Sequence, residues 1–130
     1  MHDLPMTEDD LLEKYGLRPT GAQLDEVRGI LTREMREPEP DVGLMKLCCV
    51  QLFLNGSLED APLIWEAKES GWDAHCSIDV QLLCGAGLEA TLAHLEGEAL
   101  DYLKLCVESG DFEDFSVSRQ AEWYAEYYEE

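Results

Sequence analysis

The segment from Val42 to Leu54 constrains the fold more than any other part of the chain, because it is apolar on nearly every face of a helix. It lacks the alternation of a half-buried strand, and Asp41 precedes it as a candidate helix N-cap. It includes Lys46 and Gln51 and is far shorter than the ~20 residues that a membrane span needs. A helix of this kind is usually buried among others, so we expect it at the centre of a helical fold.

The rest of the chain reads as a series of short helices, with no segment that alternates convincingly as a strand does. Capping residues, Pro and Gly mark where these helices begin and end. Starts are predicted at Thr7, Thr20, Asp41 and Pro62, at Asp73 or Ser77, and near Ser116 or Ser118, and ends at Gly16, Pro38, Gly56, Gly71, Gly85 and Gly110. The sequence therefore predicts an all-α protein.

A weak internal repeat suggests how the helices are arranged. Glu69-Ser70-Gly71 recurs as Glu108-Ser109-Gly110, and each copy ends a helix that follows another apolar helix. Pairs of about 40 residues are typical of HEAT-like stacks, although a Ser-Gly helix end is common enough to recur by chance. We predict a single compact domain over residues 1–130, built of short stacked helix pairs, either HEAT-like or an irregular bundle. Its parts are N-terminal helices over 1–40, two helix-pair units over 41–110, and an acidic, aromatic helix over 111–130.

The charge of the chain limits its partners. Nine Lys and Arg stand against 29 Asp and Glu, a formal net charge of −20. Such a molecule repels nucleic acids and anionic membranes, so we expect it to bind neither directly. Beyond residue 40 nineteen acids face only four bases, although a solvated helix face usually mixes both signs. The excess favours a surface for a basic protein partner; the alternative is that the acids serve solubility or adaptation to salt.

Aromatic residues lie among these acids near the C-terminus. Tyr and Trp bury large areas at interfaces, and carboxylates around them steer a basic partner. On a helix Trp123 shares a face with Tyr127, and Tyr124 with Tyr128, so we expect one pair inside and the other at the surface.

The stretch from Gly71 to Ser77 is a second candidate. It is either a helix cap with a buried Trp72, which we favour, or an exposed recognition loop. The candidate partner-binding residues of both regions are Trp72, Asp73, Asp111, Glu113, Asp114, Glu122, Trp123, Tyr124 and Tyr127.

The motifs of catalysis and metal binding are missing from the sequence. The histidines are scattered, and neither His75-Cys76 nor Cys48-Cys49 has the spacing that brings two ligands onto one metal. Gly85-Ala86-Gly87 lacks the continuation of a phosphate-binding loop and follows no predicted strand, so we interpret it as a turn. We therefore expect no catalytic residues, no metal and no cofactor, and hence no enzymatic activity.

Cysteine usage and the N-terminus indicate the compartment. Five cysteines are an odd number, and Cys48, Cys49, Cys84 and Cys106 lie within apolar helical patterns, where a free thiol behaves as a small apolar group. The first residues have neither the basic nor the apolar region of a secretory signal. We expect a cytoplasmic protein.

Several stretches resemble a family of small, acidic, helical bacterial proteins: residues 63–68 (LIWEAK), residues 72–87, Gly110-Asp111-Phe112 and the Trp- and Tyr-rich C-terminus. The resemblance covers about residues 60–130 and brings no catalytic motif. In general character the chain is similar to immunity proteins of bacterial polymorphic toxin systems. That similarity implies an inhibitor that neutralises a basic toxin domain by occluding its active site. The alternatives are a helical-repeat adaptor and a nucleic-acid mimic that inhibits a DNA-binding enzyme.

Overall fold

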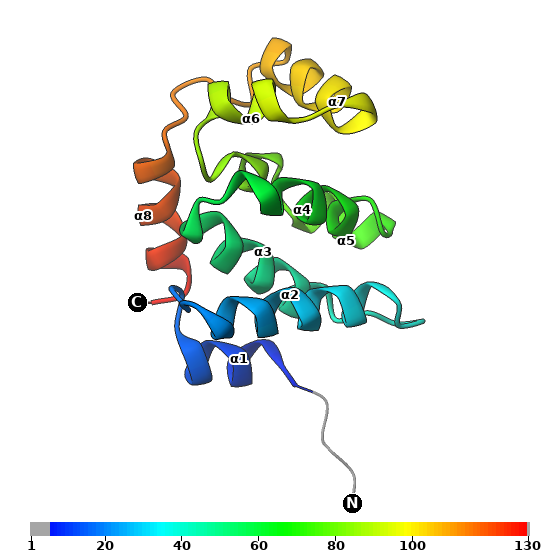
Figure 1. Ribbon diagram of the computed structural model, residues 1–130, viewed down its shortest axis with the longest axis vertical. Helices are drawn as coiled ribbons and strands as arrows, with labels where there is room; N and C mark the ends of the chain where they lie inside the picture. Colours follow the sequence, from blue (N-terminus) through cyan, green and yellow to red (C-terminus); the bar gives the residue numbers. More distant parts are fainter. Residues whose placement is uncertain (1–5, 130) are drawn as a thin grey trace, which may run out of the picture.

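The helices are stacked along the long axis of the molecule, and one of them runs down the side of the stack (Figure 1). The computed structural model describes residues 6–129, and this range contains helices and no strand. From one end to the other the stack contains α1 (Glu8–Tyr15), α2 (Ala22–Met35), α3 (Val42–Asn55), α4 (Ala61–Lys68), α5 (Trp72–Ser77), α6 (Leu88–His94) and α7 (Gly97–Glu108), and the lateral helix is α8 (Val117–Tyr127). The prediction of an all-α fold of packed helix pairs is confirmed.

Helix α3 is the centre of the core, as its apolar sequence predicts. Every residue from Leu47 to Phe53 is buried, and α3 packs against α1, α2, α5 and the 3-10 helix η2 (Val80–Cys84). The Asp41 side chain accepts a hydrogen bond from the Leu44 N–H at 3.0 Å and caps the first turn. Gly56 ends the helix in the left-handed conformation, with a φ of 75°.

The other predicted helix starts are confirmed at α1, α4 and α8 and partly wrong at α2. Thr7 and Asp10 form a reciprocal capping box on α1, and the Ser116 side chain caps α8. Helix α2 begins after Gly21 without a side-chain cap. One of the two hydrogen bonds of a capping box is present there, since the Thr20 N–H donates to the Gln23 side chain at 3.1 Å.

The helix predicted from Asp73 or Ser77 through Leu83 is wrong. Two short elements, α5 and η2, replace it, because the extended backbone of Ile78 ends α5. Buried Lys68 ties α4 to this break: its Nζ donates to the carbonyls of His75 and Ile78, both at 2.6 Å. The internal repeat does not account for α5 or η2. When Glu69-Ser70-Gly71 is aligned with Glu108-Ser109-Gly110, α4 aligns with part of α7, but α5 aligns with the turns that follow α7.

Two contacts fix the short segments that flank α4. Buried Asp60, at the end of the 3-10 helix η1 (Leu58–Asp60), accepts two hydrogen bonds from the Arg28 guanidinium of α2, at 2.7 and 2.9 Å. Gly85, in the turn after η2, lies against the end of α3: a Cβ there would stand 2.4 Å from the Phe53 carbonyl oxygen. Any larger residue at position 85 would push these two segments apart.

The predicted burial of the four helical cysteines is confirmed. Burial raises the pKa of Cys48 and of Cys84 to about 12, and that of Cys49 and Cys106 also lies above its usual range. These thiols therefore stay protonated and unreactive at neutral pH. Within residues 6–129 no helix has the length and apolar character needed to cross a membrane.

Candidate binding surface

Helix α8 turns one of its aromatic pairs into the core. Tyr124 is fully buried, with its ring 6.2 Å from that of Phe53 and its hydroxyl donating to the Asp79 carboxylate at 2.5 Å. Tyr128 is half-buried on the same face. The inclusion of Tyr124 among the partner-binding residues is wrong, because its ring fills space against α3. The expectation of one pair inside and one at the surface is confirmed.

The outward pair, Trp123 and Tyr127, is half exposed, at 50% and 51%. Their ring centroids are 5.4 Å apart, and the Lys46 ammonium of α3 lies 5.1 Å from the Tyr127 ring and 6.0 Å from that of Trp123. A cation within about 6 Å of a ring centroid is attracted to its face. The same Nζ is 4.0 Å from Asp79. The rings of α8 therefore already have a cation, supplied by the chain itself.

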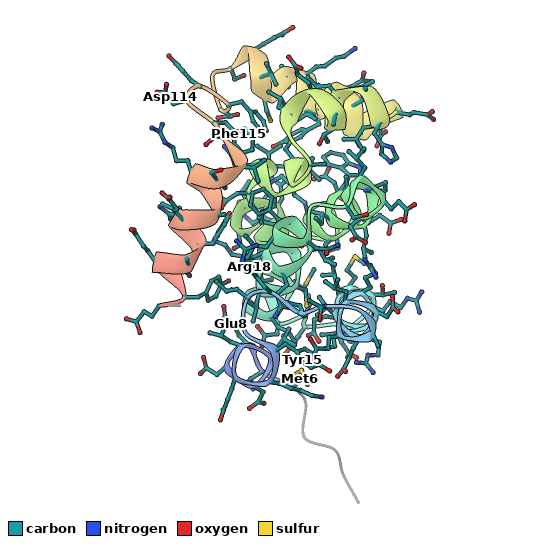
Figure 2. All side chains as sticks on the ribbon, turned by 60° about the vertical axis from the view of Figure 1, so that its left-hand side comes forward. Met6, Glu8, Tyr15, Arg18, Asp114 and Phe115 are labelled. Atoms are coloured by element: carbon teal, nitrogen blue, oxygen red, sulfur yellow. The ribbon has the colours of Figure 1, made fainter. Side chains whose placement is uncertain are left out.

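The acids before α8 are at the surface, and the rings between them are not. Asp111, Glu113 and Asp114 are exposed on the turns between α7 and α8, and Figure 2 shows Asp114 pointing away from the stack. Phe112 is buried and Phe115 half-buried, with ring centroids 5.2 Å apart. These rings anchor the turns to the core. The segment therefore presents carboxylates without an aromatic contact beside them. Glu122, also exposed, lies further along, within α8.

Trp72 is the most exposed large apolar side chain of the described residues, at 78%. The favoured interpretation, a buried Trp within a cap, is wrong. Helix α5 begins at Trp72 itself, and Ala74 is the residue that this helix turns into the core. The indole thus projects from the first turn, with the exposed carboxylate of Asp73 beside it.

Trp72 is one end of a row of rings from three helices. Its indole stacks on His75 of α5 at 6.4 Å, His75 meets the edge of Tyr102 of α7 at 5.7 Å, and Tyr102 lies 5.2 Å from Trp65 of α4. His75 Nδ1 is also 2.8 Å from a carboxylate oxygen of Glu69. We call Trp65, Trp72, His75 and Tyr102 the aromatic row. Sequence reasoning missed three of its members, since no local pattern places α4 beside α7.

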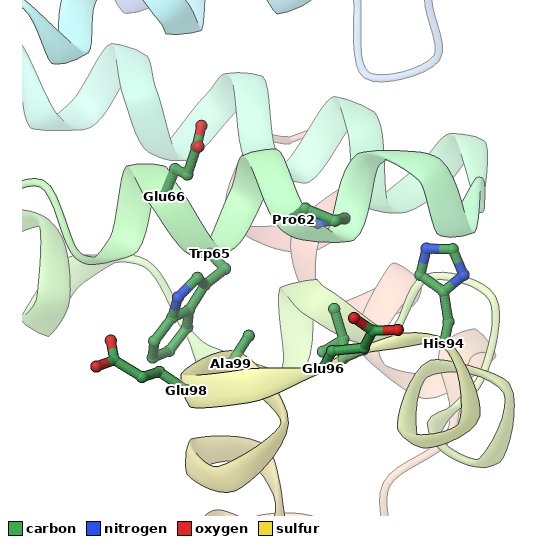
Figure 3. A pocket seen from close by; sticks show the side chains of 8 residues that line it. Pro62, Trp65, Glu66, His94, Glu96, Glu98 and Ala99 are labelled. Carbon is green, nitrogen blue, oxygen red and sulfur yellow. The ribbon is translucent and has the colours of Figure 1, made fainter.

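A hollow lies at each end of the aromatic row. Beside Trp72, a groove of about 560 Å³ separates the α2–α3 connection from the start of α5; its lining includes Met35, Glu37, Pro38, Glu39, Trp72 and Asp73. Beside Trp65, a hollow of about 450 Å³ lies between α4 and the α6–α7 link (Figure 3); its lining includes Pro62, Trp65, Glu66, His94, Glu96 and Glu98.

We call the aromatic row together with the acids of the two hollows the acidic aromatic face; these acids are Glu37, Glu39, Glu66, Asp73, Glu96 and Glu98. None of them takes part in the ion pairs found within residues 6–129. The nearest cation to the row, Lys68, lies 5.9 Å from the Tyr102 ring, but it is buried and engaged by backbone carbonyls. Burial also lowers the pKa of Lys68. The face thus joins one exposed ring, Trp72, and three half-buried rings to carboxylates that have no ion-pair partner in this part of the chain.

The two predicted regions do not form one surface. Helix α5, which begins with Trp72 and Asp73, lies on the side of the stack away from α8 (Figure 1). Within residues 6–129 no three His, Cys, Asp or Glu side chains converge closely enough to hold a metal ion. Comparisons of the chain with protein-family models, with curated proteins and with solved structures found no match.

Proposed function

We propose that this chain is a non-enzymatic binding protein that captures a basic protein partner on the acidic aromatic face. The observation that carries the proposal is the aromatic row, which ends in a Trp72 indole that is 78% exposed and lies between two hollows lined by carboxylates. Trp and Tyr rings that line hollows at the surface are typical of the residues that contribute most to binding energy. Because the Trp72 indole leaves most of its surface in water, it contributes little buried area to the fold.

Charge and rings have separate tasks in this proposal. The net charge of −20 attracts a basic partner over several ångströms and raises the rate of encounter. The rings then bury apolar area, which slows dissociation, because most differences in affinity between related complexes lie in the dissociation rate. The carboxylates around the rings become neutralised only in the complex.

The partner that we propose is a toxin domain, with the chain acting as its immunity protein by covering the active site. A toxin that cleaves or modifies nucleic acid needs a basic active-site surface, because its substrate is a polyanion. The acidic aromatic face is complementary to such a surface in charge. We place this activity in the cytoplasm, a proposal supported by the free thiols, including exposed Cys76, since a reducing compartment keeps such thiols unpaired.

Two steps test the function. The tagged full-length chain is first purified from its own cell, and a basic protein is expected to co-purify in stoichiometric amount with wild type and with Trp123→Ala, but not with Trp72→Ala. That protein is then expressed alone and with the chain. Growth arrest by the partner alone, relieved by co-expression of the chain, supports an immunity protein; a partner that is harmless alone contradicts it. Capture of an acidic partner, or of none, contradicts the binding proposal itself.

A further inference from the structure

We infer that the hollow beside Trp65 binds the side chain of one arginine of the basic partner. This inference rests on the proposed function, which it deepens by assigning a specificity pocket within the acidic aromatic face. The pocket combines an aromatic wall, an apolar floor and carboxylates, and no Lys or Arg is among the residues that line it. Its volume of about 450 Å³ lies within the range of small-ligand sites.

The wall and the floor suit the aliphatic part of such a side chain. Figure 3 shows Trp65 reaching from α4 toward the first turn of α7, where Ala99 and Glu98 lie beside it. Leu95 and Ala99 are buried and form the floor, and Pro62 adds an apolar edge. An arginine entering here would bury its three methylene groups against apolar atoms while its guanidinium stays near the rim.

The carboxylates suit the charged end. Glu96 and Glu98 lie on the α7 side of the pocket, Glu98 next to the Trp65 ring and Glu96 between that ring and His94 (Figure 3). Glu66, which also lines the hollow, points away from α7, so we expect it to contribute to the negative field at the rim more than to direct contact with the guanidinium. Glu66 also lies in the last turn of α4, where the helix dipole disfavours a carboxylate. A bound cation would offset that cost.

Arginine fits this pocket better than lysine. Its guanidinium is planar, stacks on an indole face and can donate to two carboxylates at once, whereas an ammonium is a compact, strongly hydrated charge. Trp is also the ring that attracts cations most strongly. The combination of one indole and two neighbouring carboxylates therefore favours arginine.

The test follows the indole N–H signals of the full-length chain by NMR during titration with N-acetyl-L-arginine amide. Trp→Phe variants assign the signals of Trp65, Trp72 and Trp123. We expect the Trp65 signal to move in a saturable way, with a dissociation constant in the millimolar range, while that of Trp123 stays in place. N-acetyl-L-citrulline amide, which has the same shape without the charge, is expected to leave Trp65 unmoved.

Two matched double variants test which carboxylates bind the guanidinium. The double variant Glu96→Gln, Glu98→Gln should weaken arginine binding at least tenfold, and Glu66→Gln should weaken it less. The matched double variant Glu122→Gln, Glu126→Gln removes the same charge from α8 and should leave binding unchanged. All these substitutions keep side-chain size and lie at exposed positions, so the fold is retained.

Specific outcomes overturn the inference. Equal movement of Trp65 with citrulline, undiminished binding by the Glu96 and Glu98 double variant, or no movement with arginine would each do so, and equal affinity for N-acetyl-L-lysine amide would overturn the choice of arginine. Failure of the proposed function is recognised separately. A basic partner captured through Trp72, with Trp65 silent toward arginine, contradicts only the pocket; arginine binding at Trp65 without any basic partner contradicts the proposed function.

Discussion

The α8 side and the acidic aromatic face both combine aromatic rings with acids, and they differ in the groups that the chain itself places beside the rings. By the α8 side we mean α8 and the acidic turns that precede it, from Asp111 to Phe115. On the α8 side, the Trp123 and Tyr127 rings lie near the ammonium of Lys46. On the acidic aromatic face, the rings lie beside one another, and the six carboxylates of the two hollows have no ion-pair partner within residues 6–129, although Glu69 lies 2.8 Å from His75 of the row. Rings among acids are thus not enough to identify a binding surface. The exposed acids Asp111, Glu113, Asp114 and Glu122 of the α8 side have no ion-pair partner within these residues either. What distinguishes the two surfaces is that Lys46 already lies over the rings of α8.

Helix α8 contributes its aromatic residues mainly to the fold. Tyr124 fills space against Phe53 and donates to Asp79, so the helix is fixed to both α3 and the segment before η2. Trp72 of the acidic aromatic face has no comparable task, because it leaves most of its surface in water. The comparison predicts that changes on the α8 side alter stability and that changes on the acidic aromatic face alter binding.

The largest effect is expected for Trp72→Ala. We expect affinity for the basic partner to fall about 100-fold, close to 3 kcal/mol, as for a central aromatic anchor, while thermal stability stays within ~0.5 kcal/mol of wild type. Trp123→Ala should weaken binding less than threefold. Titration calorimetry with the captured partner measures both. Equal losses for the two variants would end the distinction between the surfaces.

The next largest effect is expected for Gly85→Ala, which acts on the α8 side of the core. A Cβ at this position meets the Phe53 carbonyl oxygen at 2.4 Å, and Phe53 carries the ring that Tyr124 contacts. The free energy of unfolding should fall by about 2 to 3 kcal/mol, with partner binding retained wherever the variant is folded. Gly29→Ala, within α2 and with open space at its Cβ, should instead stabilise by about 0.5 to 1 kcal/mol. Urea unfolding gives the free energy of unfolding of both variants. Equal changes for the two would contradict the close approach of Gly85 to the Phe53 carbonyl.

Tyr124→Phe should cost about 2 kcal/mol at neutral pH, because it removes a buried hydrogen bond to a carboxylate. Burial, followed by the bond to Asp79, raises the pKa of the Tyr124 phenol above its usual value near 10. The folded state therefore holds this proton more tightly than the unfolded state, so the phenol's contribution is complete below pH 10 and is lost as the pH rises above it. Unfolding measured from pH 7 to 11 should show the variant and wild type converging above pH 10. Tyr127→Phe, at an exposed ring, should follow wild type at every pH.

Equal charge changes on the two sides should have unequal effects on association. The triple variant Glu37→Gln, Glu39→Gln, Asp73→Asn should slow association about five- to tenfold at low salt, because these carboxylates surround the groove beside Trp72. The triple variant Asp111→Asn, Glu113→Gln, Asp114→Asn should slow it less than twofold. Stopped-flow mixing at several salt concentrations gives both rates. A slower rate for the second triple than for the first would place the steering charge beside α8.

The smallest effect concerns repulsion between the carboxylates. Raising the salt concentration to 0.15 M shortens the range of each charge to about 8 Å, so the melting temperature should rise by about 3 to 5 °C. The melting temperature of the Glu37, Glu39 and Asp73 triple variant should rise less with salt than that of the Asp111, Glu113 and Asp114 triple variant. Scanning calorimetry shows this, and a melting temperature independent of salt would mean that the acids are already well separated.

Local features of the fold could be predicted from the sequence, because they depend on neighbours. The caps at Thr7, Asp41 and Ser116 and the helix end at Gly56 each need only a side chain or a backbone conformation within a few residues. The central position of α3 follows from its composition alone. The end of α5 could not be predicted, because its apolar pattern continues through Ile78 while the backbone becomes extended.

The geometry of the candidate binding surface depends on contacts between distant segments, which the sequence alone does not give. The helical period pairs Trp123 with Tyr127 and Tyr124 with Tyr128, but only the positions of Phe53 and Asp79 decide which pair is inside. Whether Trp72 is buried or exposed depends on the residue at which α5 begins, and the sequence does not fix that residue. Contacts between Trp65 and Tyr102 join helices distant in sequence, so no local pattern indicates the aromatic row.

Photo-crosslinking from two positions of the full-length chain, in its own cell, shows directly which of the two surfaces contacts the partner. Benzoylphenylalanine is placed at position 72 in one variant and at position 123 in another, so that each surface carries the same probe. We expect a single basic protein to crosslink from position 72 and not from position 123. Crosslinking from position 123 alone, or of an acidic protein from position 72, would contradict this expectation.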